Sequence, residues 1–200
     1  DFVFTGRAAH AAASPHLGRS ALDAVELMSV GVNYMREHMP SDARVHSAVL
    51  DTGGIAPNVV QAHARVRYSI RAMDLPGMLD LVERVHKIAQ GAAMMTETRV
   101  DMKIISAVSN TLGNKPLEQA LYRAMEELGA PAFDDNDRNF ARRIRETLSE
   151  QEIASVYQAI GMPVTDAPLA EFLVPFDTVR RPFIGSTDIA DVSWVVPTVP

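Results

Sequence analysis

A single histidine, His10, stands among small residues in the run GRAAHAAASP, which covers positions 6–15. Small neighbours give an imidazole room to project into a cleft, where it can donate or accept a proton near neutral pH. The alternative is a histidine that is hydrogen-bonded within a turn and takes no part in chemistry. His10 is therefore the first candidate for a catalytic residue.

Three arginines share one face of a predicted strand. Apolar and polar residues alternate over positions 62–71, which predicts a strand with one packed face, and the other face carries Arg65, Arg67 and Arg71. A guanidinium suits bidentate binding of a carboxylate, and Arg71 stands at the end of the strand. A solvated sheet face is the alternative, because three arginines occupy it.

Two loops carry further polar candidates. Asn58 follows Pro57 in a loop after two glycines, and by residue type alone it is a common turn former. Ser186 and Thr187 follow Gly185 near the end of the chain. Their hydroxyl groups either bind polar groups of a substrate or cap the turn that follows them.

The titratable residues show no pattern typical of a metal site. All six histidines lie between His10 and His86, the chain contains no cysteine, and neither an HExxH nor a His-x-Asp motif occurs. A hydrolytic zinc or manganese site needs several histidine and carboxylate ligands that converge on one point. We therefore expect no complete metal site within this chain.

Composition excludes several classes of partner. A net charge of −6 and a pI near 5.5 argue against a nucleic acid or an anionic membrane as partner. No apolar run approaches the length needed to span a bilayer. The lack of cysteine fits the reducing cytoplasm, where we expect the protein to work. Because the chain starts within an apparent strand and without Met, we interpret it as a segment of a longer protein.

The predicted elements over residues 1–110 follow the order β-α-β-β-α-β. Strands are expected at 2–12, 44–50, 62–71 and 99–104. One helix begins after Ser20 with an apolar stripe, and a second begins at Pro76 with another; these stripes are Ala21, Val25, Met28, Val32, Met35 and Met78, Val82, Val85, Ala89, Ala92. This order predicts a ferredoxin-like α/β sandwich: a four-stranded antiparallel sheet with both helices on one face.

The pattern changes over residues 111–200. An amphipathic helix is predicted at 117–128 and a second, rich in Arg and Glu, at 137–160. Prolines and carboxylates dominate 161–182, so a long irregular connection is expected there. The boundary near Asn110 divides the chain into two domains.

Four segments together resemble the M20 family of metallopeptidases and amidohydrolases, and most of all its aminobenzoyl-glutamate utilisation branch. They are residues 6–24, 51–60, the strand ending at Arg71, and 185–194. The similarity covers nearly the whole chain and is loosest between about 114 and 183. It implies that residues 1–110 form the α+β lid, or dimerisation, domain and that 111–200 form part of the α/β catalytic domain.

The resemblance also implies roles for the candidate residues. His10 matches the lid histidine that reaches into the active site of a partner subunit, polarises the scissile carbonyl and stabilises the oxyanion. Arg71 matches the lid arginine that binds the substrate carboxylate, and Asn58 matches an asparagine of the same polar pocket. Ser186 and Thr187 resemble the substrate-side loop of the catalytic domain.

For the full-length protein, the resemblance implies a metal-dependent amidohydrolase of N-acyl or N-aroyl amino acids such as p-aminobenzoyl-glutamate. Its divalent metal, zinc or manganese, has ligands outside this chain, so we expect the segment alone to be inactive. The implied partners are a second copy, bound through the lid as a homodimer, and a second, different subunit. The competing hypothesis is a non-catalytic dimerisation or small-molecule-binding module of ferredoxin-like fold.

Overall fold

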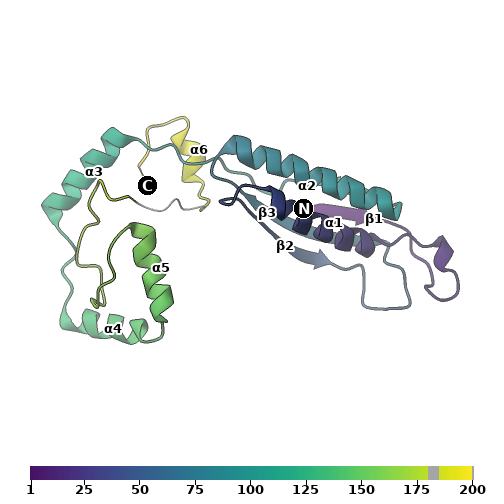
Figure 1. The fold of residues 1–200 in the computed structure, drawn as a ribbon, viewed down its shortest axis with the longest axis horizontal. Coiled ribbons are helices and arrows are strands. Elements are labelled where there is room, and N and C mark those ends of the chain that lie inside the picture. The colour runs from purple at the N-terminus through teal and green to yellow at the C-terminus, as the bar shows by residue number, and fades with distance from the viewer. Residues whose placement is uncertain (180–184, 200) are drawn as a thin grey trace. The chain divides into compact units, whose positions relative to one another are not determined.

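The computed structural model describes residues 1–179 and 185–199. The chain divides into two compact units, an N-terminal unit over 1–110 and a C-terminal unit over 111–200, which are described separately (Figure 1). Within the described ranges, no helix is long and apolar enough to cross a membrane.

The N-terminal unit has the predicted element order and an antiparallel sheet. The four strands lie in the order β2-β3-β1-β4, and β1 pairs antiparallel with β3 and β4, as β2 does with β3. The elements in chain order are β1 (Phe2–Thr5), α1 (Ala21–Met35), β2 (Arg44–Asp51), β3 (His63–Arg71), α2 (Leu75–Thr96) and β4 (Arg99–Met102). This confirms the predicted ferredoxin-like sandwich.

Both helices pack on one face of this sheet and form a single core with it (Figure 1). The sheet contributes buried apolar residues from alternate positions, and the two helices contribute one apolar stripe each. The largest buried side chains are Phe4, Val66, Val25, Met28, Val32, Leu81 and Val85. Burial of one sheet face leaves the charged residues of β3 on the opposite face.

The first helix begins and packs as predicted. Ser20 caps α1, because its hydroxyl oxygen accepts a hydrogen bond of 3.1 Å from the Asp23 N–H. All five residues of the predicted apolar stripe are buried. The helix ends at Met35 and continues as a short 3-10 turn, Arg36–His38.

The buried stripe of the second helix agrees in part with the prediction, since Val85, Ala89 and Ala92 are buried as predicted. Leu81 is buried, whereas Met78 and Val82 of the predicted stripe are only partly buried. Met94 and Met95, two apolar residues near the end of the helix, are 81% and 66% exposed. At about 100° per residue, Met94 falls on the side of α2 opposite the Leu81–Ala92 stripe, so its exposure follows from helix geometry.

The first strand is shorter than predicted. β1 ends at Thr5 rather than continuing to residue 12, because the backbone after Gly6 pairs with residues before α1. A Cβ atom at Gly6 would lie 2.0 Å from the Arg19 carbonyl oxygen, so only glycine fits this close approach. The chain between Gly6 and Ser20 is therefore a loop, and it carries His10.

The C-terminal unit contains four helices within its described residues, and one prediction there is wrong. Its helices are α3 (Lys115–Leu128), α4 (Asp135–Arg145), α5 (Glu150–Ile160) and α6 (Ile189–Ser193). The single helix expected at 137–160 is divided in two, because Ser149 and Glu152 form a capping box that starts a new helix. Residues 161–179 hold no helix or strand, as expected; positions 180–182 of that prediction lie outside the described residues.

Truncation of two leucines on α2 tests which of them contributes to the core. We expect Leu81→Ala to lower the free energy of unfolding by about 2–5 kcal/mol, because truncation leaves a cavity in packed surroundings. Leu79→Ala, the same change two residues away at a side chain that is 55% exposed, should cost less than about 1 kcal/mol. Urea unfolding followed by circular dichroism measures both. Equal losses would contradict the assignment of Leu81 to the core.

Candidate functional site

The loop that carries His10 is closed at its base by a backbone bridge between Arg7 and Arg19. Arg7 N–H donates to the Arg19 carbonyl oxygen at 2.8 Å, and Arg19 N–H donates back to Arg7 at 2.9 Å. The Arg7 guanidinium also donates to the Leu17 carbonyl oxygen. We call residues 7–19 the His10 loop.

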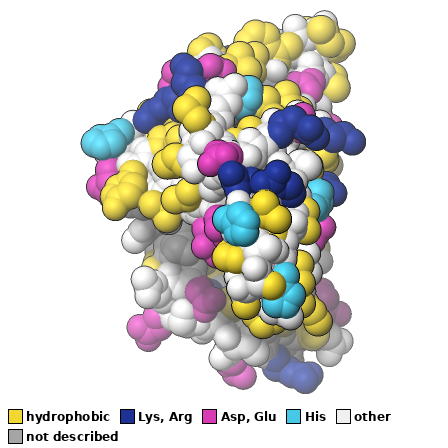
Figure 2. Space-filling view, turned by 90° about the vertical axis from the view of Figure 1, so that its right-hand side faces the viewer, with side chains coloured by type: hydrophobic (Ala, Val, Ile, Leu, Met, Phe, Trp, Pro, Cys, Tyr) yellow, Lys and Arg dark blue, Asp and Glu magenta, His cyan; other side chains and the backbone are white. Residues whose placement is uncertain are grey.

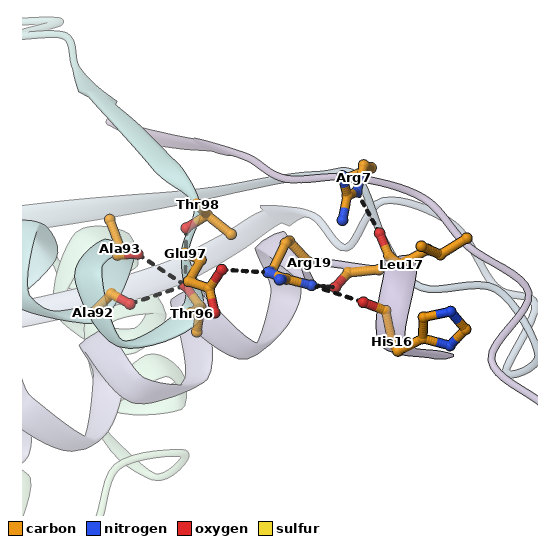
Figure 3. A network of polar contacts seen from close by, with 10 residues as sticks. Arg7, His16, Leu17, Arg19, Ala92, Ala93, Thr96, Glu97 and Thr98 are labelled. Carbon is orange, nitrogen blue, oxygen red and sulfur yellow. Dashed lines mark hydrogen bonds and ion pairs between the residues drawn. The ribbon is translucent and has the colours of Figure 1, made fainter. Parts of the chain in front are cut away.

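The Arg19 side chain ties this loop to the end of α2 (Figure 3). Its Nε donates to Glu97 Oε2 at 2.8 Å, and one terminal nitrogen donates to the carbonyl oxygens of Gly18 and His16. Glu97 terminates α2 in the left-handed conformation, with φ of 52°. Sequence pattern does not predict this pair, because the two residues are 78 positions apart and no local motif links them.

A second anchor joins the His10 loop to the loop that carries Asn58. Ala11 N–H donates to the Asn58 carbonyl oxygen at 2.9 Å, and Val60 N–H donates to that of Ala9 at 2.9 Å. His10 pairs with Val59 between these two bonds. The structure therefore places His10 and Asn58 next to each other.

The imidazole of His10 is exposed, and one of its nitrogens is occupied. The backbone N–H groups of Ala12 and Ala13 donate to Nδ1 at 3.3 and 3.2 Å. An N–H can only donate, so Nδ1 must present its lone pair, and the proton of the neutral ring is on Nε2. His10 is thus hydrogen-bonded in a turn, as one alternative proposed, and still offers a donor at Nε2.

The loop that carries Asn58 begins in a tight turn held by Asp51. The Asp51 carboxylate accepts from Gly53 N–H at 2.8 Å and contacts His63 Nδ1 at 3.1 Å. The Gly53 hydrogen bond, with a smaller contribution from the charge of His63, holds the pKa of Asp51 below its usual value. Gly53 has φ of 80°, which favours glycine.

Cationic and imidazole side chains gather at this end of the N-terminal unit. Figure 2 shows arginine or lysine side chains next to histidines on the surface seen from the side of the His10 loop. The loop itself contributes Arg7, His10, His16 and Arg19. Such a surface favours ligands that carry, or develop, negative charge.

Arg71 lies at the opposite end of the same sheet. It ends β3, and the eight steps from His63 to Arg71 span about 26 Å at about 3.3 Å per residue. His10 pairs with Val59, which precedes His63, so it lies beyond the other end of the strand. The structure brings His10 and Asn58 together and keeps Arg71 of the same chain apart from them.

The other two arginines of this strand have a structural partner. Arg67 Nε lies 2.7 Å from Asp1 Oδ1, and Arg65 Nε lies 3.0 Å from Asp1 Oδ2. Both guanidinium groups thus neutralise one carboxylate on the outer face of the sheet. Arg65 and Arg67 therefore have a structural role on this face.

Ser186 and Thr187 lie in the C-terminal unit, immediately before α6. Both are exposed, and the Thr187 carbonyl oxygen accepts from Ala190 N–H at 3.2 Å. Thr187 Oγ1 lies 3.4 Å from the Ile189 N–H, at the long end of a hydrogen bond. These contacts fit the turn-forming alternative for Thr187.

No group of three histidine, aspartate or glutamate side chains in the described ranges, 1–179 and 185–199, is arranged to hold a metal ion. The Nδ1 atom of His10, a potential ligand, already accepts two backbone hydrogen bonds. These residues alone do not fit a hydrolytic metal centre.

Comparisons with known proteins give a consistent result, although no family model matches the chain. It is 42% identical over 205 residues to one of the two subunits of the p-aminobenzoyl-glutamate hydrolase of Escherichia coli (strain K12), covering 97% of this chain and 43% of that protein. It is 30% identical over 127 residues to a Xaa-Arg dipeptidase of Mus musculus, covering 63% and 29%. A crystal structure of the aminobenzoyl-glutamate utilization protein from Klebsiella pneumoniae superposes with a TM-score of 0.51 at 25% identity, covering 62% and 31%.

The chain belongs to the M20 family of metallopeptidases and amidohydrolases. Its similarity to the Escherichia coli hydrolase confirms the resemblance to the aminobenzoyl-glutamate utilisation branch. The chain spans less than half the length of this Escherichia coli relative, at 43%.

The Arg19–Glu97 contact gives a test of how the His10 loop is held. We expect Arg19→Ala to speed hydrogen exchange of the loop amides by about ten-fold, because the lost, largely exposed hydrogen bonds together stabilised the closed loop by about 1.4 kcal/mol. Mass spectrometry after deuterium labelling measures this, with α1 peptides as the internal reference. Arg99→Ala, which removes an exposed contact of 3.4 Å to Asp101, is the control. Unchanged loop exchange in Arg19→Ala would refute the anchoring role.

Proposed function

We propose that the full-length protein hydrolyses the amide bond of N-acyl or N-aroyl amino acids. The name of the Escherichia coli relative makes p-aminobenzoyl-glutamate the first substrate to test. The observation that carries the proposal is the Nε2 donor of His10, held in a fixed tautomer beside Asn58.

His10 acts on the carbonyl oxygen in this proposal. Attack on an amide carbon moves negative charge onto that oxygen, and a donor already oriented toward it lowers the barrier. Two backbone N–H groups hold Nδ1, so little reorganisation of the ring is needed. Asn58, whose carbonyl oxygen accepts a hydrogen bond from Ala11 N–H, brings a second polar residue to the same end of the unit.

Arg71 binds the carboxylate of the amino acid in this proposal. The length of β3, about 26 Å, separates it from the end of the sheet beyond which His10 lies. This is well beyond the reach of either side chain, so one substrate cannot touch both in one subunit. We therefore propose a homodimer in which each substrate meets His10 and Asn58 of one subunit and Arg71 of the other. Two-fold pairing of identical subunits is the commonest symmetry that would do this.

The proposed mechanism also requires a divalent metal ion. The ligands of a zinc or manganese ion would come from parts of the full-length protein outside this chain, which covers 43% of the Escherichia coli relative. The segment alone would then be inactive. A second, different subunit is also a proposed partner, because the hydrolase to which that relative belongs has two named subunits.

The substitution His10→Ala tests the central residue in the full-length protein. We expect kcat to fall by about two to three orders of magnitude with KM little changed, because the lost donor acts mainly on the transition state. Hydrolysis of p-aminobenzoyl-glutamate provides the assay. His16→Ala, at an exposed histidine of the same loop, is the matched control and should leave kcat nearly unchanged.

Mixed dimers test whether His10 acts across the subunit interface. Subunits with His10→Ala, mixed with subunits disabled at the metal site, should regain part of the activity. If hybrid dimers form and stay inactive, His10 acts within its own subunit and the crossed arrangement is wrong. No turnover of any N-acyl amino acid by the wild type would favour the non-catalytic module.

The proposed role of Arg71 is tested through KM rather than through kcat. We expect Arg71→Ala to raise KM by about ten-fold or more, because a charge-assisted pair with a carboxylate is lost. Arg71→Lys should rescue poorly, since an ammonium group lacks the two-pronged geometry. Arg99→Ala, an outward arginine of β4, serves as the control. An unchanged KM in Arg71→Ala would remove Arg71 from the site.

A further inference from the structure

The pairing of β2 with β3 is irregular next to the loop that carries Asn58. The register is regular up to Val49. Asp51, rather than Leu50, then pairs with Arg65, so β2 contains one extra residue. A β-bulge of this kind re-aims the side chains that follow it, and bulges are common beside functional sites. The bulge at Leu50 therefore decides on which side of the sheet Asp51 lies.

The bulge places the Asp51 side chain on the outer face of the sheet. In the regular register Asp51 would pair with Ala64, which is fully buried in the core. A shift of one residue moves a strand residue to the opposite face. Asp51 pairs instead with Arg65 on the outer face, where its carboxylate lies beside His63. The distortion thus keeps a carboxylate out of the core and gives it an outward contact.

The Asp51 carboxylate closes the base of the Asn58 loop, residues 52–62. One oxygen accepts from Gly53 N–H at 2.8 Å, and the other contacts His63 Nδ1 at 3.1 Å. The carboxylate thereby joins the first turn of the loop to the residue that follows it. The two ends approach so closely that a Cβ atom at Gly53 would lie 2.1 Å from the His63 carbonyl oxygen. We call Asp51 and His63 the loop clamp.

The clamped Asn58 loop in turn holds the His10 loop. The Asn58 carbonyl oxygen accepts from Ala11 N–H at 2.9 Å, next to the bridge between His10 and Val59. Hydrogen bonds weaken steeply when their angle departs from linearity, so a shift of one loop displaces the other. The position of the His10 imidazole therefore depends on a contact made by two other side chains.

We propose that Asp51 and His63 are positioning residues for His10. The inference rests on the proposed function and deepens it: the clamp acts through the backbone of the Asn58 loop, and neither side chain touches the substrate. Each of the two side chains is 49% exposed, so the contribution of their contact is moderate.

This role affects kcat more than KM. His10 acts on the transition state, and a small displacement of its Nε2 donor weakens that interaction. Arg71, which binds the substrate carboxylate in the proposed function, lies at the other end of β3. Loss of the clamp should therefore leave substrate binding nearly unchanged.

Kinetics of the full-length protein test the clamp. We expect Asp51→Ala to lower kcat for p-aminobenzoyl-glutamate by about ten-fold with KM little changed, because both contacts of the carboxylate are lost. Asp51→Asn keeps an oxygen for Gly53 N–H and a polar group for His63, so it should retain most of the activity. Asp101→Ala removes an exposed carboxylate that contacts Arg99 at 3.4 Å; it is the matched control and should leave kcat nearly unchanged.

Combination with His10→Ala distinguishes positioning from a general loss of structure. If the clamp acts through His10, Asp51→Ala should cause no further loss in the His10→Ala background, because residues that act as a unit are not additive. A loss of the same size in both backgrounds overturns the proposal. Equal losses in Asp51→Ala and Asp51→Asn, or an equal loss in Asp101→Ala, also overturn it.

Hydrogen exchange keeps the inference testable if the proposed hydrolysis fails. In Asp51→Ala, the amides of 52–62 and of the His10 loop should exchange about five-fold faster or more, with α1 peptides as the internal reference. Asp101→Ala should leave both loops unchanged. Faster exchange of both loops in a protein without turnover supports the clamp and contradicts the proposed function alone. Unchanged exchange, or faster exchange confined to 52–62, contradicts the clamp whatever the activity.

Discussion

His10 and Asn58 lie together because the pairing between β1 and β3 continues past the end of both strands. Gly6 N–H donates to the Ala62 carbonyl oxygen at 2.7 Å, and the bonds of Val60 to Ala9 and of Ala11 to Asn58 extend the antiparallel pairing outward, with the register shifted by one residue. Gly6 lets the chain turn away from the sheet without losing this partner, since no Cβ fits there. The chemistry proposed for His10 therefore depends on backbone pairing that starts in the core of the N-terminal unit.

The length of β3 sets the other constraint. One end of the strand leads into the loop beside His10, and the other end carries Arg71, about 26 Å away. A rigid sheet cannot bend to bring these ends together, so their joint action on one small molecule requires a second copy of the unit. The strand that contributes to the core is thus also the reason why the proposed site needs two subunits.

Local patterns predicted much of this unit, and contacts distant in sequence account for the rest. The alternation over 62–71 predicted β3 and its charged face, and Ser20 predicted the start of α1, because both signals act within a few residues. The capping box at Ser149 is also a local signal, and it divides the single helix predicted at 137–160 into two. The Arg19–Glu97 contact and the Arg44–Arg71 register depend on how separate elements meet, which periodicity does not determine.

The arginines of the outer sheet face show why residue type alone could not assign their roles. Arg65 and Arg67 have the same chemistry as Arg71 and alternate on the same strand, yet β1 brings the Asp1 carboxylate to them. At the far end of β3, the cross-strand neighbour of Arg71 is Arg44, another cation. An arginine next to a carboxylate contributes mainly to the structure, because the two charges neutralise each other. The neighbours that the sheet register brings to each arginine, rather than its residue type, therefore distinguish these positions.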